Sequence, residues 1–172
     1  MANSPATRSF CVPFLLGVAA CLVLSSCSLI GTAASVGLMK LQFGCLVEGT
    51  PIDTPSGPVP VEQLVAGDLV TGYDGTPVRV RQLHQYQEDP AATRHLAVHF
   101  VGGGEIRLSA RHRICGIPAG DLESGEELGG RVVARIRPLA GVSRSFDLLT
   151  DDAGYRIHGI PVNSMIEEMA GH

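Results

Sequence analysis

Cys45 and the glycine before it are the first residues of this sequence whose types and order could do chemistry. A cysteine thiolate is a strong nucleophile, and here it could attack the carbonyl carbon of Gly44. The peptide bond between the two residues would then rearrange to a thioester, which water, a small thiol or an amine attacks readily. Gly44 suits this reaction because it leaves the carbonyl unhindered and tolerates a strained backbone. A free thiol has a pKa of about 8.5, so the nucleophile needs a base or a cation nearby.

Ser109 and His112, further along the chain, could complete such a site. The His112 imidazole could orient the scissile amide and protonate the departing amine of Cys45. The Ser109 hydroxyl could donate a hydrogen bond to the oxyanion of the tetrahedral intermediate. Alternatively, Ser109 and His112 could simply cap a turn, and Cys45 could be a buried structural thiol.

The residues around these positions follow long patterns with fixed spacing. From Cys45 the chain reads C-L-x-x-G-T-x-I-x-T, and residues 59–70 read V-x-V-E-x-L-x-x-G-D-x-V. Residues 108–113 read L-S-x-x-H-R, residues 145–148 read S-F-D-L, and residues 155–162 read Y-x-x-x-G-I-x-V. These blocks resemble Hint domains, the family of hedgehog autoprocessing domains, inteins and bacterial intein-like domains. The resemblance covers about residues 44–166 and is greatest to standalone bacterial Hint domains.

The resemblance implies a set of catalytic residues. The family has a T-x-x-H motif where this chain has Ser109 and His112, so one hydroxyl stands for another. It implies that Cys45, Ser109 and His112 are catalytic and that Asp147 assists proton transfer at the Cys45 sulfur. Asp147 could instead satisfy a buried backbone donor.

Neither a cofactor nor a metal ion is expected, because no Cys/His pair has the spacing of a zinc site. The remaining histidines are better interpreted as surface or strand residues: His84, His95, His99, His158 and His172.

The last block departs from the intein pattern. Inteins end in His-Asn, and the Asn side chain cyclises to cut the C-terminal bond. The resemblance places Asn163 at the His position and Ser164 at the Asn position, and serine cannot form a succinimide. Full protein splicing is therefore not expected. There is also no room for a homing endonuclease between Cys115 and Gly129.

The N-terminal residues resemble an export signal rather than part of the fold. An apolar run of about 15 residues, 10–24, has the length of a signal-peptide core and is short for a membrane span. The following Leu24-Ser25-Ser26-Cys27 resembles a bacterial lipobox, which implies cleavage after Ser26 and a diacylglycerol on Cys27. Its acyl chains would hold the protein on a membrane. An uncleaved anchor and plain secretion remain alternatives.

These features predict three parts: a lipoprotein signal peptide at 1–26, a lipid-anchored tether at 27–44 and a Hint domain at 45–172. Ser28 after the lipidated cysteine implies the outer membrane, on its periplasmic side. The membrane, through Cys27, is the one partner that we expect, and no protein partner can be named.

Composition and periodicity predict an all-β domain. The chain has 172 residues, 45% hydrophobic, which is enough for one domain of ordinary size. Its net charge of −4 argues against a general nucleic-acid binder. The 21 glycines and 11 prolines suit many turns between short strands. Strands are expected at 59–62, 67–71, 78–81, 95–101, 105–108, 132–136, 146–149 and 155–162, with Pro161 marking the last as an edge strand.

The leading hypothesis is an N–S acyl shift and self-cleavage between Gly44 and Cys45, a single-turnover reaction that would free residues 45–172 from the lipidated stub. The alternative is a processing-inactive Hint-fold lipoprotein that serves as a binding or structural module. In either case a disulfide between Cys45 and Cys115 could lock the nucleophile until it is reduced. A peptidase that acts on other proteins has little support, because no substrate pocket can be read from the sequence.

Overall fold

The computed structural model describes residues 45–89, 91 and 93–164, and this part of the chain is almost entirely β-structure. Its strands are β1 (Leu46–Val47), β2 (Pro51–Ile52), β3 (Val59–Pro60), β4 (Leu69–Thr71), β5 (Pro77–Gln87), β6 (His95–Phe100), β7 (Glu105–Ser109), β8 (Arg113–Ile114), β9 (Ile117–Pro118), β10 (Glu127–Leu128), β11 (Arg131–Leu139), β12 (Arg144–Thr150), β13 (Gly154–Ile157) and β14 (Ile160–Asn163). Two single 3₁₀ turns, η1 (Val61–Gln63) and η2 (Ala119–Asp121), are the only helical elements in these residues. The all-β prediction is confirmed.

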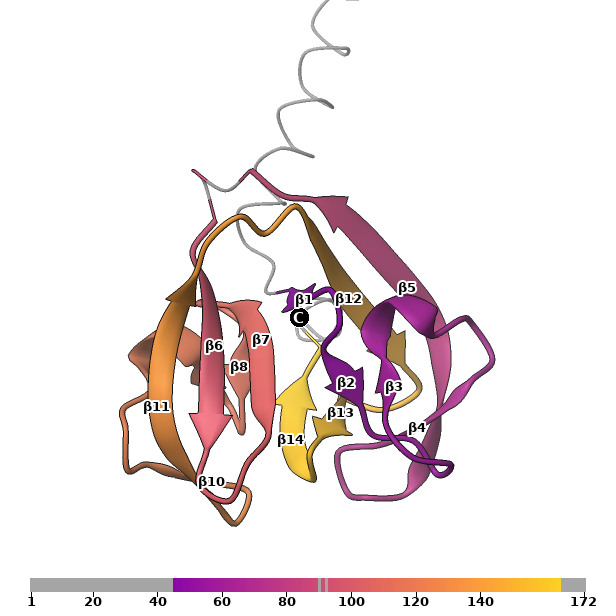
Figure 1. Cartoon of the computed structure of the whole chain (residues 1–172). Coiled ribbons are helices and arrows are strands. Elements are labelled where there is room, and N and C mark those ends of the chain that lie inside the picture. Colours follow the sequence, from indigo (N-terminus) through magenta and orange to yellow (C-terminus); the bar gives the residue numbers. More distant parts are fainter. Residues whose placement is uncertain (1–44, 90, 92, 165–172) are drawn as a thin grey trace, which may run out of the picture. The chain divides into compact units, whose positions relative to one another are not determined.

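The strands form one large sheet and two small ones. The large sheet has eight antiparallel strands in the order β10-β11-β6-β7-β1-β12-β5-β4. A four-stranded sheet has the order β13-β14-β8-β9, and β2 pairs with β3 alone. Figure 1 shows β6, β7 and β11 on the left and β5 and β12 on the right, with the short β1 between them. The two residues of β1 therefore join the two halves of the large sheet.

One face of the large sheet forms the core. Leu46 pairs with Leu108 on one side and with Phe146 on the other, and Leu108 pairs with Leu96. All four side chains are at most 2% exposed. Because side chains alternate between the two faces of a strand, the residues next to this apolar row point to the opposite face. Cys45 is one of them.

Two strand predictions are corrected by the structure. Residues 155–162 form a hairpin of β13 and β14 rather than one strand, since His158 and Gly159 both adopt positive φ values of 53° and 79°. The Asp53 carboxylate stabilises this turn by accepting the backbone N–H groups of His158 and Gly159 at 3.0 and 2.6 Å. Pro161 does not mark an edge, because β14 lies between β13 and β8.

The second correction concerns residues 59–62, where the strand ends at Pro60 and η1 follows. The predicted signal peptide and tether at 1–44, with Cys27 and Gly44, lie outside the described residues. Within the described residues, no helix has both the length and the apolar character needed to cross a bilayer.

Candidate active site

Cys45 lies directly before β1 and is only 5% exposed. Its backbone is held by Ser109 at the end of β7. The Ser109 N–H donates to the Cys45 carbonyl at 2.8 Å, and the Cys45 N–H donates to the Ser109 Oγ at 3.2 Å. This Cys45 nitrogen belongs to the peptide bond that the sequence predicts to be cut. The serine hydroxyl thus contacts the nitrogen of the bond predicted to be cut.

The Ser-x-x-His spacing has a structural cause. The His112 N–H donates to the Ser109 carbonyl at 3.1 Å, which closes a tight turn. The Ser109 carbonyl thus accepts the His112 N–H, while the Ser109 hydroxyl accepts the Cys45 N–H. The His112 carbonyl accepts the Ala119 N–H at 2.8 Å, and the side chain of His112 is fully buried. The turn therefore places the backbone of His112 beside that of Ser109.

Asp147 reaches the same place from the other side of β1. Leu46 pairs with Phe146, and Val47 pairs with Ser145. Continuing this antiparallel register by one residue sets Cys45 opposite Asp147, which is fully buried. The nucleophile therefore lies between Ser109 and Asp147, although these residues are far from it in sequence.

The strand register extends this row across five strands. His95 of β6 pairs with Ser109, and His84 of β5 pairs with Asp147. We call the five aligned positions the reactive row: His95, Ser109, Cys45, Asp147 and His84. Directly paired residues project from the same face of a sheet, so the five side chains share one face.

Two members of the row were interpreted from sequence only as strand or surface residues. His95 is indeed a strand residue, but it is just 2% exposed, and His84 is half-buried. No local motif marks either residue; only the pairing of β6 with β7 and of β5 with β12 brings them to the site.

Tyr86 is a further residue that sequence reasoning missed. It lies two residues after His84 on the same face of β5, and the two rings stack with centroids 6.5 Å apart. Burial, and then the negative charges of Cys45 and Asp147, raise the pKa of Tyr86 to about 12. A neutral phenol therefore lies within electrostatic reach of both reactive groups.

Cys115 is not part of this arrangement. Neither it nor Cys45 forms a disulfide. Cys115 lies in the β8–β9 turn with φ 51°, and its Sγ contacts the Pro161 carbonyl at 3.7 Å. Burial raises the pKa of the Cys115 thiol, so it stays protonated at neutral pH. The structure holds both cysteines as thiols.

The end of β14 differs from a splicing site in its contacts as well as in its residue types. The Asn163 Oδ1 accepts the Gly116 N–H at 3.2 Å, so this amide ties β14 to the β8–β9 turn. Ser164 is fully buried, and its backbone N–H donates to the Ala153 carbonyl at 3.3 Å.

No group of three or more potential metal-binding side chains occurs among residues 45–89, 91 and 93–164.

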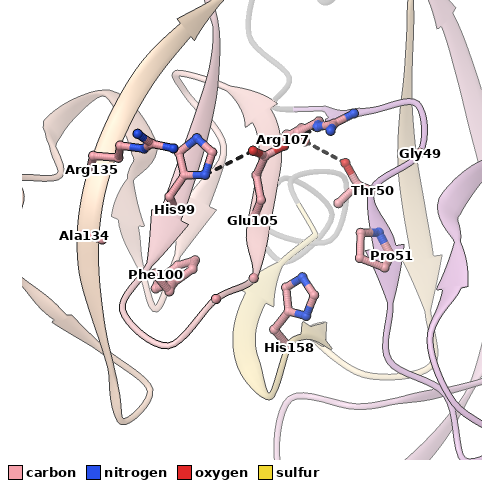
Figure 2. A pocket seen from close by; sticks show the side chains of 12 residues that line it. Gly49, Thr50, Pro51, His99, Phe100, Glu105, Arg107, Ala134, Arg135 and His158 are labelled. Carbon is pink, nitrogen blue, oxygen red and sulfur yellow. Dashed lines mark hydrogen bonds and ion pairs between the residues drawn. The ribbon is translucent and has the colours of Figure 1, made fainter.

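A cavity of about 650 Å³ lies elsewhere on the domain. Figure 2 shows it between β6, β7 and β11 on one side and the Gly49–Pro51 turn with His158 on the other. Glu105 lies at its centre, bound by the Arg107 guanidinium and by His99 Nδ1 at 3.1 Å. We call this the basic cleft. It is lined by none of the residues that the sequence predicts to be catalytic.

Known structures share this architecture. The MchDnaB-1 intein is 24% identical, with 69% of this chain and 99% of that chain covered and a TM-score of 0.59. The bacterial intein-like domain from Clostridium thermocellum is 21% identical, covering 70% and 97%, with a TM-score of 0.59. A DnaB intein from Synechocystis sp. PCC 6803 is 15% identical, covering 70% and 98%, with a TM-score of 0.60. No curated protein sequence matches the chain.

A sequence model of the Hint domain matches residues 44–115, from the residue before the nucleophile to the β8–β9 turn. Together with the shared architecture, this match shows that the chain carries a Hint domain. Its fold is shared with inteins and with a bacterial intein-like domain. The expected family and fold are therefore confirmed.

Proposed function

We propose that this Hint domain cleaves its own chain between Gly44 and Cys45 by an N–S acyl shift. The observation that carries the proposal is the hydrogen bond from the Cys45 N–H to the buried Ser109 Oγ at 3.2 Å. It fixes the nitrogen of the scissile bond inside a site that also contains His112 and Asp147.

The reaction begins when the Cys45 thiol loses its proton, with Asp147 assisting that transfer. The sulfur then attacks the Gly44 carbonyl carbon, and the resulting oxyanion needs a hydrogen-bond donor. When the C–N bond breaks, His112 delivers a proton to the departing nitrogen, which becomes the amine of Cys45. The product is a thioester between Gly44 and the Cys45 sulfur.

A second step resolves the thioester. Water attack leaves a carboxylate on Gly44 and returns the Cys45 thiol, while a small thiol or amine would leave a new thioester or an amide. The reaction ends there, because Ser164 cannot cyclise and Asn163 is held by Gly116. Each molecule therefore reacts once.

Cleavage before Cys45 would separate the domain from the segment that we expect to anchor it. If Cys27 carries a lipid, the released stub 27–44 is a membrane anchor, and residues 45–172 leave the membrane. We propose the periplasmic side of the outer membrane as the place where this occurs.

Intact mass spectrometry tests the proposal. The full chain is given a C-terminal affinity tag, so that the intact chain and the product are both recovered. Wild-type protein yields a product that begins at Cys45, and Cys45→Ala yields none. Cys115→Ala is the matched control and cleaves like wild type, since its thiol lies outside the site. Dithiothreitol accelerates release if thiols resolve the thioester. An uncut wild-type chain with and without dithiothreitol overturns the proposal.

The basic cleft favours a second function, that of a binding module. Its volume of about 650 Å³ lies in the range of small-molecule sites, and Glu105 already has two partners. Arg135 lines the cleft without a hydrogen bond or ion pair to any described residue, so its guanidinium is available to an anion. Titration with inorganic phosphate, followed through the imidazole signals of His99 and His158, tests this function. Arg135→Gln should weaken the response.

A further inference from the structure

His95 has a place in the reactive row but no part in the mechanism described above. It opens β6, is 2% exposed and pairs directly with Ser109. The Ala110 N–H donates to the Arg94 carbonyl at 2.8 Å, which makes the adjacent pair of His95 and Ser109 a non-hydrogen-bonded pair. Side chains come closest in such pairs, with Cβ atoms about 4.5–5.5 Å apart. The imidazole is thus a direct neighbour of the hydroxyl that holds the scissile nitrogen.

The hydrogen bonds of His95 determine its tautomer. Burial lowers its pKa, so the ring is neutral at neutral pH despite the opposing effects of the Glu88 charge and a hydrogen bond to the Thr93 backbone. The Nε2 atom is buried and makes no hydrogen bond. The ring therefore donates to the Thr93 carbonyl through Nδ1. In a neutral imidazole the other nitrogen then carries a lone pair. His95 Nε2 is thus a buried acceptor for which residues 45–89, 91 and 93–164 supply no donor.

Ser109 presents the complementary feature. Its Oγ accepts the Cys45 N–H, but a hydroxyl also has one hydrogen to donate. No acceptor for that hydrogen is found among the described residues. Within the described part of the chain, this donor and this acceptor both lack partners, which costs free energy, and they lie on directly paired residues. Both side chains project from the same face of the sheet at adjacent positions.

We propose that His95 is a positioning residue of the cleavage reaction, whose neutral Nε2 accepts the hydroxyl hydrogen of Ser109. This bond points an oxygen lone pair of Ser109 at the Cys45 N–H and so holds the scissile amide in place for attack. It also leaves His112 as the group that protonates the leaving nitrogen. This inference rests on the proposed self-cleavage for its consequence, but the contact itself does not require cleavage.

The first test measures the contact without cleavage. In the full chain carrying Cys45→Ala, which keeps the backbone N–H and cannot react, the ¹⁵N signals of His95 are recorded. The expected result is a neutral ring with hydrogen on Nδ1 and an Nε2 signal shifted by an accepted hydrogen bond. Ser109→Ala moves that signal to the value of an unbound lone pair, whereas Ser109→Thr does not. A protonated Nε2, or an Nε2 signal that is unchanged in Ser109→Ala, overturns the inference.

The second test measures the reaction in the full chain. His95→Leu removes the acceptor and should slow appearance of the product by about 3- to 10-fold, the effect of one lost hydrogen bond. His95→Gln supplies an amide oxygen near the Nε2 position and should restore most of the rate. Thermal melts identify a variant that has simply unfolded. Equal slowing by folded His95→Leu and His95→Gln contradicts a positioning role.

The two tests separate this inference from the proposed function. If wild-type protein does not cleave but the Nε2 signal depends on Ser109, self-cleavage fails and the His95–Ser109 contact stands. If the protein cleaves, but the Nε2 signal does not depend on Ser109 and the rate does not depend on His95, the self-cleavage proposal stands and the role of His95 is wrong.

Discussion

At the level of single residues, the site depends on one exchange of hydrogen bonds. The Ser109 carbonyl accepts the His112 N–H, and the Ser109 hydroxyl accepts the Cys45 N–H. A residue that the sequence marks only as a hydroxyl near a histidine is therefore placed at the nitrogen of the scissile bond. The sequence-based prediction that Ser109 donates to the oxyanion concerns the Gly44 carbonyl, which lies outside the described residues. A hydroxyl has one hydrogen, so this contact and the proposed bond to His95 Nε2 exclude each other, and our proposal replaces the oxyanion contact with the bond to His95.

Replacement of Ser109 tests this placement. Ser109→Ala should slow cleavage about tenfold or more, because the scissile N–H loses its buried acceptor. Ser109→Thr keeps the hydroxyl and should retain most of the rate. Product formation is followed by mass on the tagged full chain. If the Ser109→Ala variant cleaves at the wild-type rate, Ser109 does not assist the reaction at the Cys45 nitrogen.

The phenol of Tyr86 reports the charge of the site. Burial and the charges of Cys45 and Asp147 raise its pKa to about 12. Asp147→Asn removes one negative charge and should lower this pKa, because forming a phenolate near a carboxylate is unfavourable. The phenolate absorbance is measured against pH, with Tyr86→Phe to isolate the signal. Asp121→Asn, which changes an exposed carboxylate, is the control and should leave the pKa of Tyr86 unchanged.

The buried neutral His95 makes stability depend on pH. Burial lowers its pKa in the folded state, whereas the unfolded chain has an ordinary value of about 6.5. As pH falls below 6.5, the unfolded chain gains a proton that the folded chain does not, so stability is lost. Urea unfolding at pH 7 and pH 5 should show a steeper loss for wild type than for His95→Gln. Equal losses would mean that His95 is protonated in the folded state.

At the level of elements, the two-residue β1 has an effect far beyond its length. It is the only strand among the described residues that joins β7 to β12, and so it joins the two halves of the large sheet. Leu46 anchors it between Leu108 and Phe146. The reactive cysteine precedes this anchor by one residue, so its position follows from the packing of the core.

Removal of the anchor should destabilise the domain. Leu46 is fully buried, and Leu46→Ala should lower the free energy of unfolding by about 2–5 kcal/mol, measured with urea. Val65 is 60% exposed, and Val65→Ala is the matched control with an expected change below about 0.5 kcal/mol. A small effect at Leu46 would show that β1 is not needed to hold the sheet together.

Local patterns predicted the elements better than their pairing. Alternating residues located β7, β11 and β12 to within a few positions, because each strand has one apolar face. The turn at His158 and Gly159 was missed, since it depends on the carboxylate of the distant Asp53. The same limit applies to the site. Spaced motifs could indicate Cys45, Ser109, His112 and Asp147, but His95, His84 and Tyr86 join them only through strand register.

At the level of the whole molecule, the proposed cleavage would couple processing to location. If Cys27 is lipidated, one bond at Cys45 decides whether the domain stays on the membrane. In fractionated cells, the wild-type domain should appear in the soluble fraction and the Cys45→Ala protein in the membrane fraction. Adding Cys27→Ala to Cys45→Ala should make the uncut chain soluble. A membrane-bound double variant would show that the lipid is not the anchor.

The tie between Asn163 and the β8–β9 turn has a consequence for the lifetime of the protein. Asn-Ser pairs in flexible chains lose ammonia with age, because the following backbone nitrogen attacks the side-chain amide. Here the amide oxygen is bound by the Gly116 N–H at 3.2 Å, and the Ser164 nitrogen donates to the Ala153 carbonyl at 3.3 Å. Both reacting groups are held in a fixed strand geometry. The domain is thereby protected from deamidation at this pair for as long as it stays folded.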